Sequence, residues 1–361
     1  MLKNFYDVVI VGGGPAGCKT AELASSLGLS VLLIEEHEEI GKPVQCSGIN
    51  SHRIISLSGL KEREIVVNKV YKARIFGDNE TFLELKSPKP VYVIDRQKLD
   101  EGIAKLAIKR GCEIQTGVKF ENFKRRGNFL LVHTSSSTIK TKILVGADGP
   151  NSTVAKLAKI EMPKEYVIGY QQTIRGDFSD NIVELWFGKT ITPDFFGWVI
   201  PENDEWARVG IASKRNVGYY FENFVRKRFG KNGEKKDIVA GIIRYGLIKT
   251  SVSDNILLVG DAASHIKAYS GGGIIYGLIA SHIAAKACFN AVKSKRYDRK
   301  FLEKEYDFKW RMVLERPIKR GLLLHKLLHS MPNNAFSALL KLGKPLRFFL
   351  NKMDMDLLFT R

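Results

Sequence analysis

The sequence predicts an α/β protein, in which a Rossmann-type nucleotide-binding domain is combined with a β-rich second domain and a C-terminal helical region. Three patterns predict this architecture. A buried strand, a glycine-rich turn and a helix follow one another within residues 6–28, and another buried strand begins near residue 254. Short strands dominate between about 160 and 250, and past residue 297 the pattern is helical.

The N-terminal elements form one βαβ unit. Residues 6–11 (YDVVIV) are a continuous apolar run rich in β-branched residues, which is typical of a buried parallel strand. After the glycines, Ala and Leu recur at helical spacing, and residues 30–36 (SVLLIEE) predict a second buried strand. A further helix is expected at 95–111, where Gly111 occupies the position of a C-terminal cap.

The turn after the first strand has the spacing of a dinucleotide-binding site. Gly12 permits a tight turn, Gly14 lets the backbone approach a pyrophosphate, and Gly17 lets the helix pack against the strand. The N-terminus of that helix offers unpaired N–H groups to the phosphates. Glu35 ends the second strand, where its carboxylate can accept hydrogen bonds from a ribose diol. This acid disfavours a 2′-phosphate, so NADP is not expected here.

Later motifs favour FAD over NAD. Asp261 ends a buried strand in LLVGDAASH, before a turn and a helix that begins at 271–274 (GGGI). A carboxylate there suits the ribitol hydroxyls of FAD, and NAD has no ribitol. Arg96 follows a short strand, and an Asp-Gly turn stands at 145–156 (VGADGPNSTVAK). Each motif alone is also compatible with an ordinary surface turn, but their combination predicts FAD.

The order of these patterns predicts a cofactor domain that is interrupted by the second domain. We expect a discontinuous FAD-binding domain, a β-rich substrate-binding domain and a basic helical region. Their expected ranges are 1–70, 91–158 and 250–292 for the first, 71–90 and 159–249 for the second, and 293–361 for the third.

At this level of detail the chain resembles a known family. The order of the glycine turn, the arginine, the Asp-Gly turn and the Gly-Asp-Ala motif is similar to that of glutathione-reductase-type flavoproteins of the aromatic-hydroxylase branch. Two stretches resemble the geranylgeranyl reductase family more narrowly, including archaeal digeranylgeranylglycerophospholipid reductases. They are PVQCSG at 43–48 and FGWVIP at 196–201. The resemblance covers roughly residues 5–290.

The resemblance implies a set of FAD contacts, several of them made by backbone atoms. By motif position they fall on Ala16, Glu35, Cys46, Ser47, Gly48, Arg96, Val118, Asp261, Gly273 and Ile274. The chain departs from the family at Phe196 and Ile200, where tyrosine and phenylalanine are usual, and at Ala268, where proline is common. The exchanges at Phe196 and Ile200 keep an apolar wall, but phenylalanine at 196 lacks the hydroxyl through which a tyrosine could deliver a proton.

The resemblance also implies an active site beside the flavin. Cys46 is expected next to the isoalloxazine ring, where its thiol could donate a proton; the alternative is a small buried residue that only packs. Phe196, Trp198 and Pro201 are expected to line an apolar groove for prenyl chains, with ordinary packing in the sheet core as the alternative. No metal site is expected, since His325 and His329 have no third ligand nearby.

The net charge and the cysteine content indicate which classes of partner and which cell compartment to expect. The formal net charge is +19, and residues 290–361 hold 17 Lys and Arg against 7 Asp and Glu. This bias favours anionic partners, and the basic amphipathic tail suits an anionic membrane surface. No recognition helix or RNA motif accompanies the charge, so nucleic acid is not expected. Four dispersed cysteines favour a reducing compartment. We expect a cytoplasmic protein, peripheral at the inner face of the membrane.

The expected activity is FAD-dependent reduction of isolated C=C bonds in geranylgeranyl chains of archaeal-type phospholipids or their precursors. A monooxygenase of the same branch and an electron-transfer flavoprotein serving a quinone are the alternatives. The second of these often carries clustered cysteines, which this chain lacks. The electron donor stays open among ferredoxin, a reduced deazaflavin and NAD(P)H, because there is no second Gly-x-Gly-x-x-Gly turn.

Overall fold

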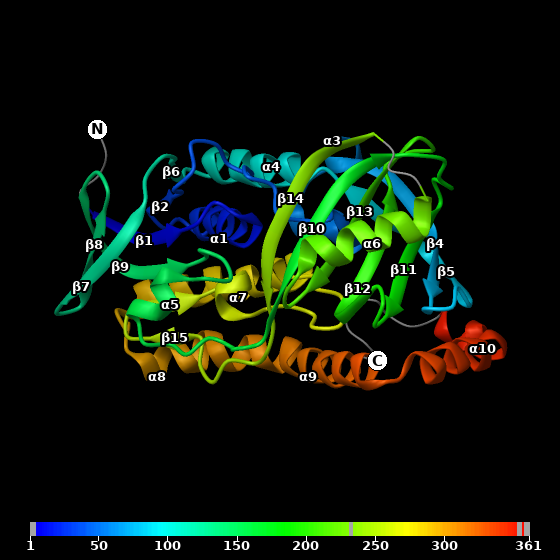
Figure 1. The fold of residues 1–361 in the computed structure, drawn as a ribbon. Helices are drawn as coiled ribbons and strands as arrows, with labels where there is room; N and C mark the ends of the chain where they lie inside the picture. Colours follow the sequence, from blue (N-terminus) through cyan, green and yellow to red (C-terminus); the bar gives the residue numbers. More distant parts are fainter. Residues whose placement is uncertain (1–4, 231–233, 352–355, 357–361) are drawn as a thin grey trace.

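A computed structural model describes residues 5–230, 234–351 and 356, which form two β-sheets with helices around them (Figure 1). The first sheet has the strand order β15–β16–β9–β1–β2–β6, and β7 and β8 extend it beside β9. The pairings β16–β9, β9–β1, β1–β2 and β2–β6 are parallel. These strands are β1 (Phe5–Val11), β2 (Val31–Ile34), β6 (Glu113–Gln115), β7 (Phe120–Arg126), β8 (Phe129–Thr134), β9 (Thr138–Gly146), β15 (Val252–Ser253) and β16 (Ile256–Leu258).

Three helices pack together beside this sheet: α1 (Pro15–Ser26) lies against both α4 (Arg96–Lys109) and α7 (Ile274–Ser294). The strands expected at 6–11 and 30–36 and the helix expected at 95–111 are therefore confirmed as β1, β2 and α4. The apolar runs of β1 and β2 are almost wholly buried, as parallel strands between helical layers should be. The predicted α/β class and Rossmann-type domain are confirmed.

The second sheet has the order β14–β10–β13–β12–β11–β4–β5–β3 and is antiparallel except at β11–β4. Its strands β4 and β5 cross the boundaries expected at residues 70 and 91 between the cofactor domain and the β-rich domain, and residues 49–51 also belong to this sheet. The division of the chain into domains stays a prediction. Its strands are β3 (Ile49–Ser51), β4 (Val66–Phe76), β5 (Phe82–Ile94), β10 (Tyr166–Arg175), β11 (Ile182–Gly188), β12 (Thr192–Pro201), β13 (Trp206–Ser213) and β14 (Lys235–Arg244).

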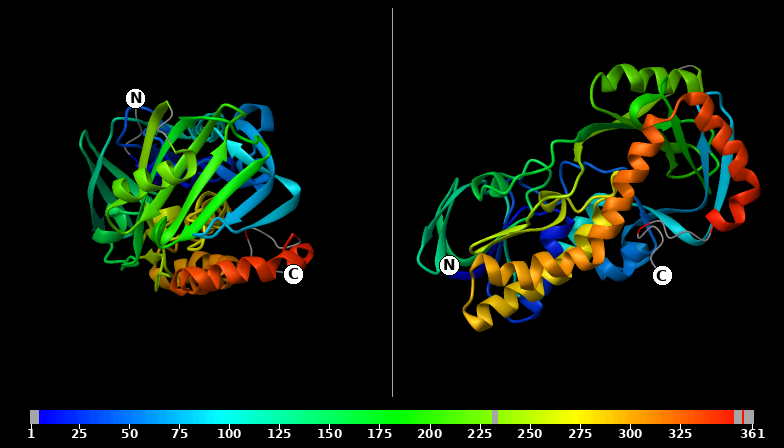
Figure 2. Two further views of the ribbon diagram at one scale, coloured as in Figure 1. Left: turned by 45° about the vertical axis from the view of Figure 1, so that its right-hand side comes forward. Right: turned by 90° about the horizontal axis from the view of Figure 1, so that it is seen from below.

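Side chains alternate across the second sheet, and each face carries its own apolar cluster. One cluster packs under α6 (Val217–Phe229) and includes Trp186. The other contains Phe196 and Trp198 and extends to apolar residues of α9 (Phe308–Ser330) and α10 (Asn333–Leu350). Figure 2 shows α9 and α10 running along the outside of the molecule. The C-terminal helices thus cover the face of the sheet that bears the expected substrate residues.

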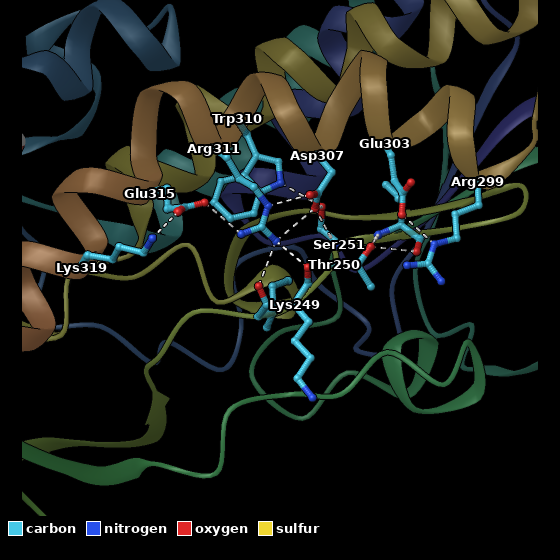
Figure 3. A network of polar contacts seen from close by, with 12 residues as sticks. Lys249, Thr250, Ser251, Arg299, Glu303, Asp307, Trp310, Arg311, Glu315 and Lys319 are labelled. Atoms are coloured by element: carbon cyan, nitrogen blue, oxygen red, sulfur yellow. Dashed lines mark hydrogen bonds and ion pairs between the residues drawn. The ribbon is translucent and has the colours of Figure 1, made fainter.

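A buried polar network fixes the start of α9 to the segment before β15 (Figure 3). Asp307 Oδ1 accepts hydrogen bonds from the backbone N and the hydroxyl of Ser251, at 2.8 and 2.6 Å. The indole of Trp310 donates to the same hydroxyl, at 2.8 Å, and Arg311 donates to Asp307 Oδ2, at 2.6 Å. Because buried polar groups of this kind are costly to leave unpaired, the network holds α9 in one place.

Among the described residues, one helix is long and apolar enough to cross a membrane by length and composition alone. It is α7, which includes His282 and Lys286. Of its most apolar 18-residue window, 61% is buried inside the protein, as is usual for a core helix.

Candidate cofactor and active site

The glycine turn after β1 has the geometry of a phosphate cradle. Gly12 has φ +105°, and a Cβ there would lie 2.4 Å from the carbonyl oxygen of Ala147. A Cβ at Gly17 would lie 2.0 Å from the carbonyl oxygen of Gly12, so α1 packs directly on the turn. At Gly14 the space is open, and the first N–H groups of α1 receive no side-chain cap. An anion fits there.

Glu35 lies over this turn. Its Oε2 accepts a hydrogen bond from the backbone N of Gly13, at 2.6 Å, and its Oε1 accepts from the backbone N of His37, at 3.0 Å. The backbone N of Val118 donates to the carbonyl oxygen of Glu35, at 2.9 Å. The structure therefore brings Val118 beside the end of β2, where the adenosine half of a dinucleotide would lie.

The Asp-Gly turn at 145–156 has a structural use in this chain. Asp148 accepts hydrogen bonds from the hydroxyl of Ser152, at 2.6 Å, and from the backbone N of Val154, at 3.0 Å. Ser152 in turn caps the short helix α5 (Thr153–Leu157). Burial raises the pKa of Asp148, and these hydrogen bonds oppose that shift. These hydrogen bonds fix the loop that contains Ala147, whose carbonyl oxygen lies against Gly12.

Asp261 stands on a 3-10 turn after β16, near the N-terminal end of α1. A Cβ at Gly273 would lie 2.5 Å from Asp261 Oδ1, so only glycine leaves this carboxylate its place. Ala16 joins the same group, because a Cβ at Gly260 would lie 2.8 Å from its methyl carbon. Ile274 is the first residue of α7. Burial raises the pKa of Asp261 to about 6, and the charge of Arg96 opposes that shift.

Arg96 connects Asp261 with Cys46. Its Nε and Nη2 donate to the two carboxylate oxygens of Asp100, at 3.0 and 2.8 Å. Burial alone would lower the pKa of Arg96, but the charges and hydrogen bonds of Asp100 and Cys46 raise it overall. The guanidinium therefore stays charged and lies against the Cys46 thiol. Arg96 therefore interacts with Cys46 and, through its charge, with Asp261, although the three residues belong to distant segments of the chain.

The segment that carries Cys46 is held by the second sheet. Gly48 has φ +81°, its backbone N donates to Cys46 Sγ at 3.3 Å, and a Cβ there would lie 2.0 Å from Arg208 Nη1. Arg208, on β13, donates from Nη1 to the carbonyl oxygens of Ser47 and Ile94, at 3.0 and 2.9 Å. No sequence motif singled out Arg208, because its role depends on a contact across 161 positions of the chain.

The expected substrate residues lie along β12. Trp198 is buried, and its indole N–H donates to Gln171 Oε1 at 2.9 Å. Phe196 stacks on Phe195, with ring centroids 4.4 Å apart. Pro201 ends the strand, and its carbonyl oxygen accepts from Asn68 at 3.0 Å. Trp198 and Phe196 are thus brought together on one face, while Pro201 marks the strand end near Arg208.

Two histidines of α9, His325 and His329, pack on the same face of the second sheet, beside Phe195. The rings of His325 and His329 lie 4.5 Å apart and 5.8 and 6.0 Å from the ring of Phe195. Burial lowers the pKa of both, to about 4 for His329. Within the described ranges no group of three His, Cys, Asp or Glu side chains is arranged to hold a metal ion.

Comparison with known proteins supports an FAD-binding fold. The model of the FAD binding domain family matches residues 5–222. An uncharacterized protein of Methanocaldococcus jannaschii is 33% identical, over 99% of this chain and 93% of its own. A digeranylgeranylglycerophospholipid reductase of Methanothermobacter thermautotrophicus is 30% identical, over 93% and 91%.

Among solved structures, a geranylgeranyl bacteriochlorophyll reductase-like protein of Thermoplasma acidophilum superposes with a TM-score of 0.87 at 24% identity, over 99% of this chain and 94% of its own. The glycine cradle, the open N-terminus of α1 and the carboxylates of Glu35 and Asp261 near that terminus fit FAD. The chain is an FAD-dependent oxidoreductase and belongs to the geranylgeranyl reductase family of FAD-binding proteins.

Proposed function

We propose that this chain saturates isolated C=C bonds in the geranylgeranyl chains of membrane phospholipids or their precursors. The observation that carries the proposal is the interaction of Arg96 with both Cys46 and Asp261, since it places a thiol able to donate a proton in the same site as a carboxylate suited to the ribitol of FAD. The name of the Methanothermobacter relative supports the lipid substrate.

Reduction of an isolated alkene needs a hydride on one carbon and a proton on the other. When bound, reduced FAD supplies the hydride. Arg96 orients the Cys46 thiol, which holds the proton, and Arg208 keeps the segment in place through Ser47. No carbonyl polarises such an alkene, so alignment and the exclusion of water supply much of the catalysis. The apolar face around Phe196 and Trp198 holds the prenyl chain in this account.

We also propose that the protein works at the cytoplasmic face of the membrane. An exposed stripe of α9 carries Phe308, Met312, Leu323 and Leu327, with exposed fractions of 62, 71, 70 and 51%. Phe308 and Met312 are four residues apart, as are Leu323 and Leu327, and eleven residues separate the two pairs. This helical spacing, with basic residues between, is typical of a helix that lies on anionic lipid. Reducing equivalents come from outside the chain: ferredoxin, a reduced deazaflavin or NAD(P)H.

An anaerobic single turnover tests the reaction. The FAD-loaded protein is photoreduced and mixed with a detergent-dispersed digeranylgeranyl phospholipid, and the flavin absorbance is followed. We expect the oxidised band to return and the lipid to gain two mass units per reduced bond. The fully saturated lipid is the control and should leave the flavin reduced. If the band returns only after oxygen is admitted and the lipid gains oxygen, the protein is a monooxygenase instead.

A further inference from the structure

Trp198 is held in one orientation by residues of two other strands of its sheet. Trp198 on β12 pairs with Gly210 on β13, and Gly210 pairs with Gln171 on β10, so the three residues form one row across the second sheet. The indole lies over Gly210, and its Nε1 donates to Oε1 of Gln171 at 2.9 Å. A Cβ at Gly210 would lie 2.4 Å from Cζ2 of the indole, so the ring can lie there only because residue 210 is glycine.

The hydrogen bond between Trp198 and Gln171 is a second constraint on the ring. Both residues are buried, with exposed fractions of 8 and 4%. An indole N–H can only donate, so this position requires an acceptor, and the amide oxygen of Gln171 supplies it. Because a buried N–H without an acceptor is costly, a side chain at position 171 that lacks an oxygen would make the indole turn toward another acceptor.

The far edge of the indole points toward β14, the strand that both expected cofactor loops touch. A Cβ at Gly169 would lie 4.0 Å from Cη2 of the indole and 3.6 Å from Cδ1 of Ile243, on β14. A Cβ at Gly271, in the glycine loop before α7, would lie 3.2 Å from that same Cδ1. Two residues earlier on β14, a Cβ at Gly241 would lie 3.3 Å from Cβ of Gln45, the neighbour of the active-site cysteine. The orientation of the indole therefore affects the part of the sheet that faces the cofactor.

We propose that Gln171 is a positioning residue: by holding the indole of Trp198 across Gly210, it determines which part of the prenyl chain lies beside the flavin. The prenyl chain contacts Trp198 in this account, and Gln171 acts only through that ring. A reacting alkene must lie within about 3–3.5 Å of the atom that attacks it, so a rotated indole that displaces the chain slows reduction. The contact between Trp198 and a prenyl chain rests on the proposed function; the fixed orientation of the indole does not.

Steady-state kinetics of the FAD-loaded protein, with dithionite as the reductant, test this role. Gln171→Met keeps the length of the side chain but removes the acceptor. It should raise KM about tenfold for a digeranylgeranyl phospholipid, and by less than about twofold for an analogue with short prenyl chains. Gln171→Glu keeps an oxygen acceptor and should have a KM near that of the wild type.

Gln172→Met is the matched control. Gln172 is also buried on β10, but its side chain lies on the opposite face of the sheet, where its Nε2 donates to the hydroxyl of Tyr170 at 3.0 Å. Its KM for the long substrate should equal that of the wild type. The same KM in Gln171→Met and the wild type would overturn the proposal, with FAD content showing that each protein is folded.

A double-mutant cycle separates an effect through Trp198 from a general effect on stability. If Gln171 acts only through the indole, Gln171→Met should not change KM further in the Trp198→Phe background, and additive effects would overturn the proposal. Gly210→Ala displaces the ring from its other side and should raise KM as Gln171→Met does. This second variant tests the proposal even if Gln171→Met does not fold.

Near-ultraviolet circular dichroism reports the orientation of the ring without turnover. Subtracting the spectrum of the Trp198→Phe protein isolates the band of Trp198. This band should lose most of its intensity in Gln171→Met and keep it in Gln171→Glu and Gln172→Met; an unchanged band in Gln171→Met would overturn the proposal. If the band is lost as expected and even the wild type reduces no lipid, the proposed function fails, whereas the role of Gln171 in orienting the indole stands.

Discussion

Arg208 Nη1 donates a hydrogen bond to the carbonyl oxygen of Ser47 at 3.0 Å, and this contact ties the second sheet to the segment that carries Cys46. Arg208 is itself oriented by Glu202, whose Oε1 lies 2.7 Å from its Nε. The guanidinium also reaches the carbonyl oxygen of Ile94, just before Arg96. One side chain therefore aligns the two stretches that flank the expected flavin ring.

Replacing Arg208 by methionine should weaken FAD binding by about tenfold or more, because two partly buried carbonyl oxygens lose a charged donor. Flavin retained after desalting, and titration of the apoprotein with FAD, measure the effect. Arg175→Met is the control, since that side chain is 55% exposed and pairs only at the surface. Full retention in Arg208→Met would contradict the role given to this contact.

Glu35→Ala should reduce FAD retention by removing the ribose partner and the acceptor for the N–H of Gly13. A loss of about 1–3 kcal/mol of binding free energy is expected for a charged hydrogen bond of this kind. Glu36→Ala, next in the chain and 55% exposed at its side chain, should keep its flavin. The flavin-to-protein absorbance ratio of the purified proteins checks this, and equal ratios would argue against Glu35 as a cofactor residue.

Cys46→Ser should slow alkene reduction by about 10²-fold or more while FAD stays bound, because a hydroxyl is a far weaker proton donor than a thiol. Flavin content and the rate of anaerobic reoxidation by the lipid are measured on the same sample. A solvent isotope effect on the wild-type rate should accompany proton donation. Normal turnover in the serine variant would leave Cys46 as a packing residue.

Trp198→Ala should impair long prenyl substrates more than short ones, since it removes an aromatic wall from the face that α9 and α10 cover. The matched control is Trp186→Ala, a buried tryptophan whose cluster lies on the other face of the same sheet. Both variants lose roughly 3–5 kcal/mol of stability, so stability alone does not separate them. Equal losses for long and short chains in Trp198→Ala would remove it from the groove.

His265 predicts how stability depends on pH. Its ring is fully buried against Trp310, and burial lowers its pKa to about 3. Below pH 6.5 the His265 ring is protonated in the unfolded chain but stays neutral in the folded chain. The free energy of unfolding therefore falls as the pH drops below 6.5. Between pH 6.5 and pH 5 this residue should lower the free energy of unfolding by about 1.5 kcal/mol. His265→Phe should flatten that part of the unfolding curve, and an unchanged slope would refute the assignment.

Sequence patterns were sufficient for the parts of the site that local geometry determines. The turn at Gly12, Gly14 and Gly17 is recognisable because its chemistry is contained in a few neighbouring residues, and β1, α1 and β2 follow it as expected. Glu35 and Asp261 were predicted as cofactor residues because each follows a buried strand, and the strands β2 and β16 before them are confirmed. The chain's family was also recognisable from such local motifs.

Long-range contacts could not be predicted in this way. Arg208 looks like any polar residue on a half-buried strand, and Asp356 lies in a tail without motifs; both meet their partners only in the folded chain. Strand pairing was equally hidden, since β3 joins the second sheet by pairing with β5, more than forty positions later. The roles of the individual cofactor residues stay predictions that the variants above test.

Lipid mass spectrometry after expression in a host that makes unsaturated digeranylgeranyl phospholipids tests the central claim most directly. The wild type should shift the lipids upward by two mass units per reduced bond, and the Cys46→Ser variant should shift them far less. Lipids of unchanged mass, in cells where the protein is folded, carries FAD and has a working electron donor, would contradict the account.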